Sequence, residues 1–597
     1  MRIKYIIYFI VLLSVLLLGR VYFLSIKSNS YYEELSKQNY IKRIYEPSVR
    51  GLIKDRNGKY LAINHLGFSI LIKPHLRSIK NIQKVEELCK MIVKYFPKQN
   101  YKKLLKKYKH NDSPYNHQYV QVVDWIAYDD FFKFYSIFNS KQNIKIVTAS
   151  KRHYPYKDVA GHILGYVNKT SLKDIKKDKI AKYYDRKGKS GLEQFYNKQL
   201  RGTLGYRDVK VNSLYQEVEV LNKVEATQTN NITTTIDIEL QQYIHKLMDK
   251  KAGAVVVMDV HNGEILSAGS FPEFDNNLFV SGISTENWKD IINDFNHPFT
   301  NKLTRGLYPP GSVIKMGVAL SFMKHKKNHR NYGVFCTGSL PLGKRNFRCW
   351  KKDGHGKTGF TKAIRESCDD FFYKGSLKVG INKIAKSLDE LGIGHKTGID
   401  LPNEFSGVNP NKQWKKVKYN QPWYIGETVV SSIGQGFILV TPMQIARYTA
   451  ALATSKLPTP HLLKDDSLIK DIKVDIPTKD LKLIQKGMYH VCNVKGGTAV
   501  RYIKKYSKVK VAGKTGTAQV VSIPQGEKKR MKEHELEYYH RSHAWLTTYA
   551  PYKNPKYIIT IMVEHGGHGG SAAGSMISKI YNKMYKLGYL TKEDLKN

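Results

Sequence analysis

Ser312 and Lys315 are the residues whose types and spacing first suggest covalent chemistry. They lie three residues apart in YPPGSVIKM, directly after a Pro-Pro-Gly break. Proline suits a first helical turn and glycine permits a sharp entry, so we expect a helix to begin at 309–312 with both side chains on one face. Free N–H groups there would stabilise an oxyanion, and the helix dipole together with burial would favour a neutral lysine as general base. The same residues also fit an alternative, in which Ser312 is a helix cap and Lys315 is a surface lysine.

Two further motifs favour the nucleophile over the cap. RESCD, residues 365–369, lies 55 residues after the first serine in a pattern typical of a helix, TKAIRESCDDFFYKGS. VAGKTGTA, residues 511–518, predicts a strand. The order S-x-x-K, S-x-D and K-T-G is typical of penicillin-binding proteins and β-lactamases. The three motifs in this order predict a serine acyl-enzyme.

The second and third motifs supply the groups that acyl transfer from a peptide needs. Ser367 can relay a proton between Lys315 and a leaving amine. Asp369 can hold a lysine or the substrate backbone through charge-assisted hydrogen bonds. Lys514 would give a positive field for a substrate carboxylate and lower the pKa of Lys315. The hydroxyl groups and the small residue that would lie along an extended peptide are Thr515, Thr517 and Gly516.

Strands and helices must bring these motifs together. Residues 253–270 are two apolar segments around Asn-Gly, and residues 543–565 are two more around a proline-flanked turn, so both predict β-hairpins. The segments between them show mostly helical spacing. Strands at both ends with helices between predict an α+β domain over residues 229–597, with a central antiparallel sheet flanked by helices.

Upstream of this domain, residues 26–228 predict an elongated α+β pedestal. RGLIKDRNGKYLAIN, residues 50–64, predicts a β-hairpin around its Asp-Arg-Asn-Gly turn. Apolar residues at helical spacing predict a helix over residues 79–96. The rest of this segment mixes short strands with basic loops, so we expect a modest core.

Residues 1–25 predict a transmembrane anchor with a short cytoplasmic tip. Arg2 and Lys4 precede an apolar run that, interrupted by Arg20, reaches roughly the 20 residues that cross a bilayer. A cleaved signal peptide is the alternative, but no small-x-small cleavage site follows Gly19. The positive N-terminus predicts that the tip stays in the cytoplasm and that the rest of the chain lies outside it.

The chain is strongly basic, with 98 Lys and Arg against 50 Asp and Glu and a formal net charge of +48. The lysines are spread along the chain, and no zinc-finger, RRM or helix-turn-helix pattern accompanies them. We therefore expect no nucleic-acid partner. A background bias in composition explains the charge, and attraction to an anionic membrane or cell wall is the functional alternative.

Beyond the three motifs, the chain resembles the class B penicillin-binding proteins, and most of all the penicillin-binding protein 2 group of Gram-negative bacteria. The resemblance covers nearly the whole chain and rests on the anchor and on RGLIKDRNGKYLA, RHYPYKDVAGHILGYV, KSGLEQFYNKQLRG, YPPGSVIKM, ESCDDFFY, VVSSIGQGFILVTPMQIA and GKTGTAQ. Asp369 stands where asparagine is commoner in the superfamily, and this group often carries the aspartate.

The resemblance implies a peptidoglycan D,D-transpeptidase of the inner membrane, mostly periplasmic, that acts in cell-wall elongation and rod-shape maintenance. It implies attack on D-Ala-D-Ala stem peptides, release of D-Ala, acyl transfer to an amine of a neighbouring strand, and covalent inhibition by β-lactams. The backbone N–H groups of Ser312 and Thr517 would be the oxyanion donors. No glycosyltransferase domain fits before residue 229, so the lipid-linked nascent glycan strands would come from a SEDS-type partner, and a rod-shape scaffold protein is also expected.

Two other functions share the motifs. A class A β-lactamase needs a glutamate above a deacylating water, and no E-x-x-x-N pattern lies between Asp369 and Lys514. The 147 residues from Ser367 to Lys514, the pedestal and the anchor also disfavour it. A β-lactam sensor or a scaffold would use the pocket without turnover, but a sensor usually needs a cytoplasmic signalling segment, and about four residues precede the apolar run.

Three of the five cysteines form a candidate metal site with one histidine. Cys336, Cys349, His355 and Cys368 follow the pattern C-x12-C-x5-H-x12-C, which makes a closed tetrahedral zinc site if the loop folds back onto the helix. Because Cys368 lies inside the S-x-D motif, a structural zinc would brace that motif without acting in acyl transfer. A Cys336–Cys349 disulfide is the alternative. The resemblance favours zinc, because some members of the group carry it at corresponding positions.

Overall fold

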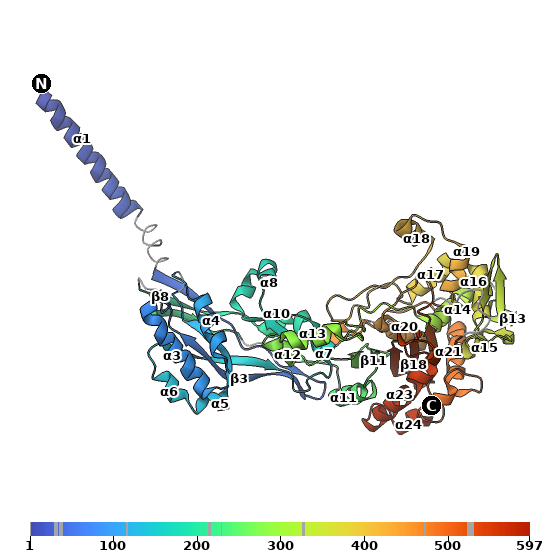
Figure 1. Cartoon of the computed structure of the whole chain (residues 1–597). Helices are drawn as coiled ribbons and strands as arrows, with labels where there is room; N and C mark the ends of the chain where they lie inside the picture. The colour runs from blue at the N-terminus through green and yellow to red at the C-terminus, as the bar shows by residue number, and fades with distance from the viewer. Residues whose placement is uncertain are drawn as a thin grey trace.

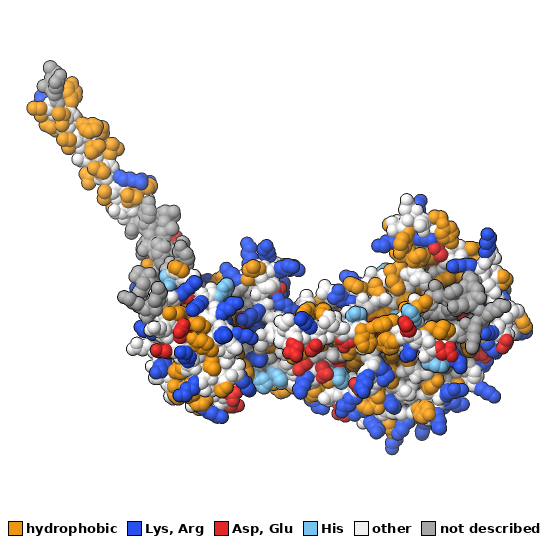
Figure 2. All heavy atoms as spheres, in the orientation of Figure 1, with side chains coloured by type: hydrophobic (Ala, Val, Ile, Leu, Met, Phe, Trp, Pro, Cys, Tyr) orange, Lys and Arg blue, Asp and Glu red, His pale blue; other side chains and the backbone are white. Residues whose placement is uncertain are grey.

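The computed structural model is elongated, with an N-terminal helix, a pedestal and a second domain in line (Figure 1). It describes residues 2–28, 34, 40–114, 117–212, 217–227, 230–324, 329–470, 472–521 and 531–596. Helix α1 (Arg2–Tyr22) projects from one end, and the stretch Ile3–Lys27 is long and apolar enough to cross a membrane. Its large apolar side chains are exposed, as lipid contact would require (Figure 2).

The described residues of the pedestal form three sheets. The first has strand order β1-β8-β9, the second has order β10-β2-β3-β4 with β5 paired to β3, and the third is the antiparallel pair of β6 (Val167–Lys169) and β7 (Arg186–Gly188). The strands are β1 (Ile41–Glu46), β2 (Ile53–Lys54), β3 (Tyr60–Ile72), β4 (Val120–Ala127), β5 (Ile144–His153), β8 (Gly205–Val211), β9 (Glu217–Val224) and β10 (Ile232–Thr233). The predicted hairpin is confirmed as β2 and β3, and the predicted helix is α3 (Ile79–Tyr95). Because β10 pairs with β2, this sheet includes residues just after the predicted border at residue 228.

A buried ion-pair network lies where the pedestal meets the second domain. The fully buried carboxylate of Glu193 accepts hydrogen bonds from Arg50 and Arg152, each at 2.7 Å. Burial opposes ionisation, but the two guanidinium groups outweigh it and hold the pKa of Glu193 below its usual value. Tyr154 donates to the same carboxylate at 3.1 Å, and its backbone exchanges two hydrogen bonds with Asn277. The network therefore holds Tyr154, whose backbone bonds to Asn277 of the second domain.

The second domain is built on a five-stranded antiparallel sheet of order β12-β11-β19-β18-β17. The strands are β11 (Gly253–Asp259), β12 (Ile265–Phe271), β17 (Ala512–Ala518), β18 (His543–Ala550) and β19 (Tyr557–Val563). Both predicted hairpins are confirmed, as β11–β12 and β18–β19. The K-T-G motif lies on β17, which is an edge strand of this sheet.

Helices cover both faces of this sheet. Thr547 of β18 hydrogen-bonds to α20 (Pro442–Thr454), and the next residue, Thr548, hydrogen-bonds to α23 (Gly569–Lys586). Successive strand residues point to opposite faces, so these two helices lie on opposite sides of the sheet. The central antiparallel sheet flanked by helices is therefore as predicted.

The segments that carry the first two motifs differ from the prediction. The serine turn Gly311–Ile314 is a 3-10 helix, and the α-helix α14 (Lys315–Lys324) begins only at the lysine. The predicted continuous helix around the second motif is wrong, because α15 (Phe360–Arg365) ends before the motif and α16 (Asp369–Val379) begins inside it. Ser367 lies in the break with φ of 53°. Apolar spacing continues across the break, so periodicity could not reveal it.

Candidate active site

The three motifs meet in one buried polar cluster. The Nζ of the fully buried Lys315 donates to Asp369 Oδ1 at 2.7 Å, to Ser367 Oγ at 3.2 Å and to Ser367 O at 3.0 Å. Lys514 is also fully buried, and its Nζ donates to Ser367 Oγ at 2.9 Å and to Thr515 O at 2.8 Å. The hydroxyl of Ser367 therefore bridges the two lysines.

The two lysines of this cluster lie in different electrostatic surroundings. Burial and the positive charge of Lys315 lower the pKa of Lys514 well below its usual value. Asp369 is the one carboxylate that pairs with Lys315 in the described part of the chain. Because an uncompensated buried charge is costly, one carboxylate stabilises one ammonium group rather than two. The geometry thus suits a single proton shared by Lys315 and Lys514, with Ser367 as the path between them.

Ser312 lies half-buried in the 3-10 turn, beside the third motif. Gly311 has φ of 55°, and a Cβ at this position would lie 2.6 Å from Thr517 O. Only glycine permits this approach of the turn to β17. The Nε2 of Gln435 donates to Thr517 O at 3.3 Å, so the end of the strand is fixed from a second side.

The structure brings all the predicted motif residues into one site but does not join Ser312 to Lys315. No hydrogen bond between their side chains occurs among the described residues, and the Lys315 Nζ bonds to the second motif instead. We expected the helix dipole and burial to leave Lys315 neutral. That expectation left out the carboxylate of Asp369, whose Oδ1 lies 2.7 Å from the Lys315 Nζ and stabilises a positive charge there. For Lys315 to accept a proton as a base, this ion pair would first have to change.

The third motif lies along the open edge of the sheet. Thr515 Oγ1 shares a hydrogen bond of 2.6 Å with Thr498 Oγ1. Gly516 packs against Pro310, where a Cβ would lie 3.0 Å from the carbonyl oxygen. Because β17 is an edge strand, an extended peptide can add beside it through backbone hydrogen bonds. Sequence reasoning missed Thr498, which belongs to no motif and becomes a neighbour only through the fold.

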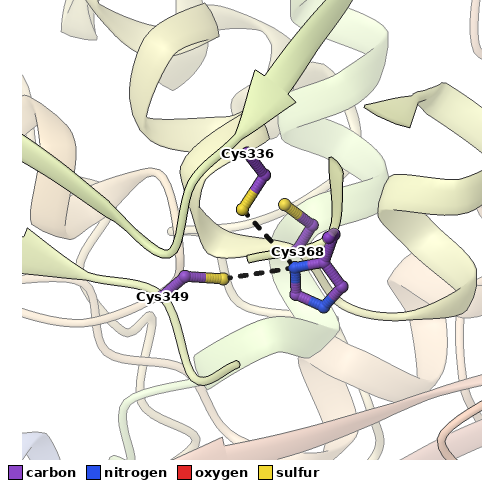
Figure 3. A group of neighbouring side chains, drawn as sticks. Cys336, Cys349 and Cys368 are labelled. Atoms are coloured by element: carbon purple, nitrogen blue, oxygen red, sulfur yellow. Dashed lines mark hydrogen bonds between the residues drawn. The ribbon is translucent and has the colours of Figure 1, made fainter. Parts of the chain in front are cut away.

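The four predicted metal ligands also meet beside the second motif (Figure 3). The ligand atoms of Cys336, Cys349, His355 and Cys368 lie within 4.8 Å of one another, and all four residues are buried. The His355 Nδ1 is 3.6 Å from Cys336 Sγ and 3.5 Å from Cys349 Sγ. All five cysteines are free, so the alternative disulfide is not formed.

This cluster fits a small thiophilic cation. Zn–S bonds of about 2.3 Å place the ligand atoms of a tetrahedral site roughly 3.8 Å apart, close to the spacing observed. A hydrogen bond from Cys368 lowers the pKa of Cys349 and raises the pKa of Cys368. Asp369 N donates to Cys349 Sγ at 3.3 Å, so the cluster is joined directly to the second motif.

Trp350 is a further site residue that sequence reasoning missed. Its backbone N–H donates to Asp369 Oδ2 at 3.0 Å, and its indole N–H donates to Glu366 O at 2.9 Å and Ser367 O at 3.1 Å. These bonds hold the strained break that carries Ser367. The available signal was its position directly after Cys349. The sequence predicts Cys349 as a metal ligand next to the second motif, so its neighbour in sequence is placed to contact that motif.

Comparison with known proteins agrees with this fold. Residues 45–234 match the Penicillin-binding Protein dimerisation domain, and residues 253–583 match the Penicillin binding protein transpeptidase domain. The chain is 34% identical over 595 residues to the peptidoglycan D,D-transpeptidase MrdA of Haemophilus influenzae, covering 96% of this chain and 89% of the relative.

Two solved structures extend the comparison. The penicillin-binding protein PBP2 in the complex with MreC from Helicobacter pylori has a TM-score of 0.84 at 41% identity, covering 92% of this chain and 99% of that one. A structure described as "Structural coordination of polymerization and crosslinking by a peptidoglycan synthase complex" has a TM-score of 0.69 at 25% identity, covering 99% of each chain.

A pedestal that matches the dimerisation domain, followed by a transpeptidase domain with these three motifs, defines a class B penicillin-binding protein. Within that class the chain belongs to the MrdA or PBP2 family of peptidoglycan D,D-transpeptidases. It is therefore a serine-type D-Ala-D-Ala transpeptidase of cell-wall synthesis, and both the family and the activity predicted from the sequence are confirmed.

Replacing Trp350 with phenylalanine should slow acylation by a penicillin. The change removes the indole N–H and keeps a ring and the backbone bond to Asp369. Loss of a hydrogen bond worth about 1 kcal/mol predicts a roughly fivefold lower second-order rate constant. Stopped-flow with a fluorescent penicillin measures it, and Trp288→Phe, away from the motifs, is the matched control. A wild-type rate for Trp350→Phe would show that the indole does not position the site.

Proposed function

We propose that Ser312 is the nucleophile and that Lys315, Ser367 and Lys514 move its proton. Ser312 Oγ attacks the carbonyl carbon of the penultimate D-Ala, forms a C–O bond and passes its proton to Lys315 Nζ. The backbone N–H groups of Ser312 and Thr517 are placed to receive the oxyanion. Collapse breaks the C–N bond, and the leaving D-Ala amine takes a proton through Ser367 Oγ. An ester on Ser312 remains.

Substrate binding makes Lys315 ready for this step. A peptide along β17 brings its terminal carboxylate to the hydroxyls of Thr515 and Thr517, beside Lys514. That negative charge stabilises a protonated Lys514, so the shared proton moves from Lys315 through Ser367 and leaves Lys315 as a neutral base. The observation that carries the proposal is the position of Ser367 Oγ, 3.2 Å from one Nζ and 2.9 Å from the other.

The second half-reaction reverses the roles of the same groups. An amine of a neighbouring stem peptide attacks the ester carbonyl and forms the new amide bond. Its proton passes to Lys315, the bond from the carbonyl carbon to Ser312 Oγ breaks, and Ser312 recovers a proton from the lysine. A β-lactam would follow the first half-reaction and remain as an ester on Ser312.

We also propose that the four-residue cluster holds a structural Zn²⁺. Cys336, Cys349 and Cys368 would bind through Sγ and His355 through Nδ1, the ring nitrogen that faces the sulfur atoms. A bound zinc would neutralise the thiolates and cross-link the loop to the break between α15 and α16. It takes no part in acyl transfer; these residues hold the backbone N–H of Asp369 in place.

The family supports proposals about location and partners. We place the N-terminal tip in the cytoplasm and the pedestal and transpeptidase domain in the periplasm, because basic residues precede the apolar run. An assembly with a MreC-type rod-shape scaffold and with a SEDS-type glycosyltransferase that supplies lipid-linked glycan strands is consistent with the relatives' complexes. The role in elongation follows from the same partners.

Intact mass with and without a penicillin tests the nucleophile. Wild type should gain one stable adduct, and Ser312→Ala should gain none, because no other hydroxyl of the motifs lies at the start of the turn. Ser321→Ala, which changes a serine buried in the following helix α14, should still form the adduct. An adduct on Ser312→Ala would refute the assignment, and rapid loss of the adduct with destruction of the drug would indicate a β-lactamase.

Metal analysis tests the zinc proposal independently of activity. The purified chain should hold one zinc per molecule, and Cys349→Ser should lose it and slow acylation, because Asp369 N loses its sulfur acceptor. Cys89→Ser, in the pedestal core, should keep the metal. A metal-free wild type in which a thiol assay shows a Cys336–Cys349 disulfide would contradict the proposal.

A further inference from the structure

Residues 407–425, which include helix α18 (Lys412–Tyr419), form an arm on the transpeptidase domain. A cavity beside this arm has no part in the proposed acyl transfer. Helix α18 projects at the opposite end of the molecule from α1 (Figure 1). An open cavity of about 410 Å³ lies between this helix, α17 (Ile381–Glu390) and residues 407–411. Ligand cavities in proteins commonly have volumes of about 300–1,000 Å³, so this one is large enough for a small ring system.

The lining of the cavity has the chemistry of a sugar site. It combines side-chain amides, one ammonium, one carboxylate and one indole, from Asn382, Asn409, Asn411, Lys386, Asp389 and Trp414. Amides and charged groups can hydrogen-bond to the hydroxyl and acetamido groups of an amino sugar. The indole offers a flat apolar surface to the C–H face of a pyranose ring. The Oδ1 atoms of Asn382, Asn411 and Asp389 already accept hydrogen bonds within the protein. The buried Oδ1 of Asn409 has no partner in the part of the chain that the structure describes, so a ligand donor would satisfy it.

Aromatic rings connect this cavity to the active site. The ring of Trp414 lies 5.4 Å from Phe437 and 5.6 Å from Tyr419. Phe437 follows three residues after Gly434, whose carbonyl accepts a hydrogen bond from Gly311 N at 2.9 Å, next to the nucleophile. Three extended residues span at most about 11 Å. A polymer bound along the arm can therefore reach the serine turn.

The exposed surface of the arm indicates what kind of polymer would bind. Large apolar side chains are strongly exposed, with Val417 at 76%, Ile425 at 61%, Tyr424 at 57% and Tyr419 at 47%. The exposed lysines of the same helix are Lys412, Lys416 and Lys418. Figure 2 shows hydrophobic and basic side chains side by side on this arm. A lipid surface would suit this mixture, but the arm lies far from the membrane helix (Figure 1).

We infer that the cavity beside Trp414 binds sugar rings of the peptidoglycan glycan strand and so positions a stem peptide at Ser312. This inference rests on the proposed function, because it takes the polymer from the reaction. The amino sugars fill the cavity against Trp414, and the Lys386 ammonium donates hydrogen bonds to their hydroxyl and acetamido oxygens. The lysines of α18 face the carboxylates of the stem peptides.

Binding of peptide-free glycan tests this site without any acylation step. Full-length chain in nanodiscs is titrated with oligomers of alternating N-acetylglucosamine and N-acetylmuramic acid whose lactyl carboxylates are blocked as amides, as the stem peptide blocks them in the strand. The dissociation constant is measured by calorimetry. Wild type and Ser312→Ala should bind saturably and equally. Trp414→Ala should bind at least tenfold more weakly. Lys386→Glu, a change on an exposed helix face, should weaken binding severalfold even if Trp414→Ala fails to fold.

Tyr506→Ala, which removes an exposed ring elsewhere in the same domain, is the matched control and should keep the wild-type dissociation constant. Absence of saturable binding by wild type would overturn the inference, as would equal binding by wild type, Trp414→Ala and Lys386→Glu. Neither result would bear on the penicillin adduct at Ser312, so failure of this site and failure of the proposed mechanism are distinguishable.

Discussion

Two buried lysines bond to one serine hydroxyl, and only one of them pairs with a carboxylate within the described ranges. This arrangement is the constraint on which the rest of the site depends. A second ammonium group in this place would be uncompensated, and burying such a charge costs several kcal/mol. The fold holds Lys315, Lys514 and Ser367 within hydrogen-bond distance, which is the arrangement that the proposed sharing of one proton requires. Each lysine comes from a different element, α14 or β17, and the hydroxyl comes from the break between α15 and α16.

The backbone break at Ser367 accounts for the contacts that Trp350 and Cys349 make around it. Ser367 adopts a left-handed backbone that L-residues avoid, and such strain persists only where neighbours over-determine it. The indole of Trp350 holds two carbonyls of the break, and Cys349 accepts the N–H of Asp369. A zinc ion on the cysteine cluster would fix both contacts from outside the reaction. Trp350 and Cys349 therefore contact the same short loop that carries Ser367 and Asp369.

Much of this could be predicted from the sequence because it is local or carried by motifs. The hairpins around Asn-Gly turns, the strand of the third motif and the N-terminal apolar helix all follow from short-range patterns. The break at Ser367 could not be predicted, since the apolar spacing runs through it and the strain is stabilised by a tryptophan 17 residues away. The sequence predicted that Asp369 can hold a lysine. It could not show that this lysine is Lys315 itself, because the pair joins residues 54 apart.

The pH dependence of Ser312 acylation by a penicillin is the most direct test of the shared proton. At a pH below the lowered pKa of Lys514, its Nζ is already protonated and cannot take a proton from Lys315 through Ser367. The acylation rate should therefore rise with pH and level off well below 10.5, the ordinary value for lysine. Ser367→Ala should lower the plateau of the acylation rate by about 10²–10⁴-fold, because the proton path between the two lysines is broken. A rate that rises only near pH 10.5, or an unchanged plateau in Ser367→Ala, would contradict the account.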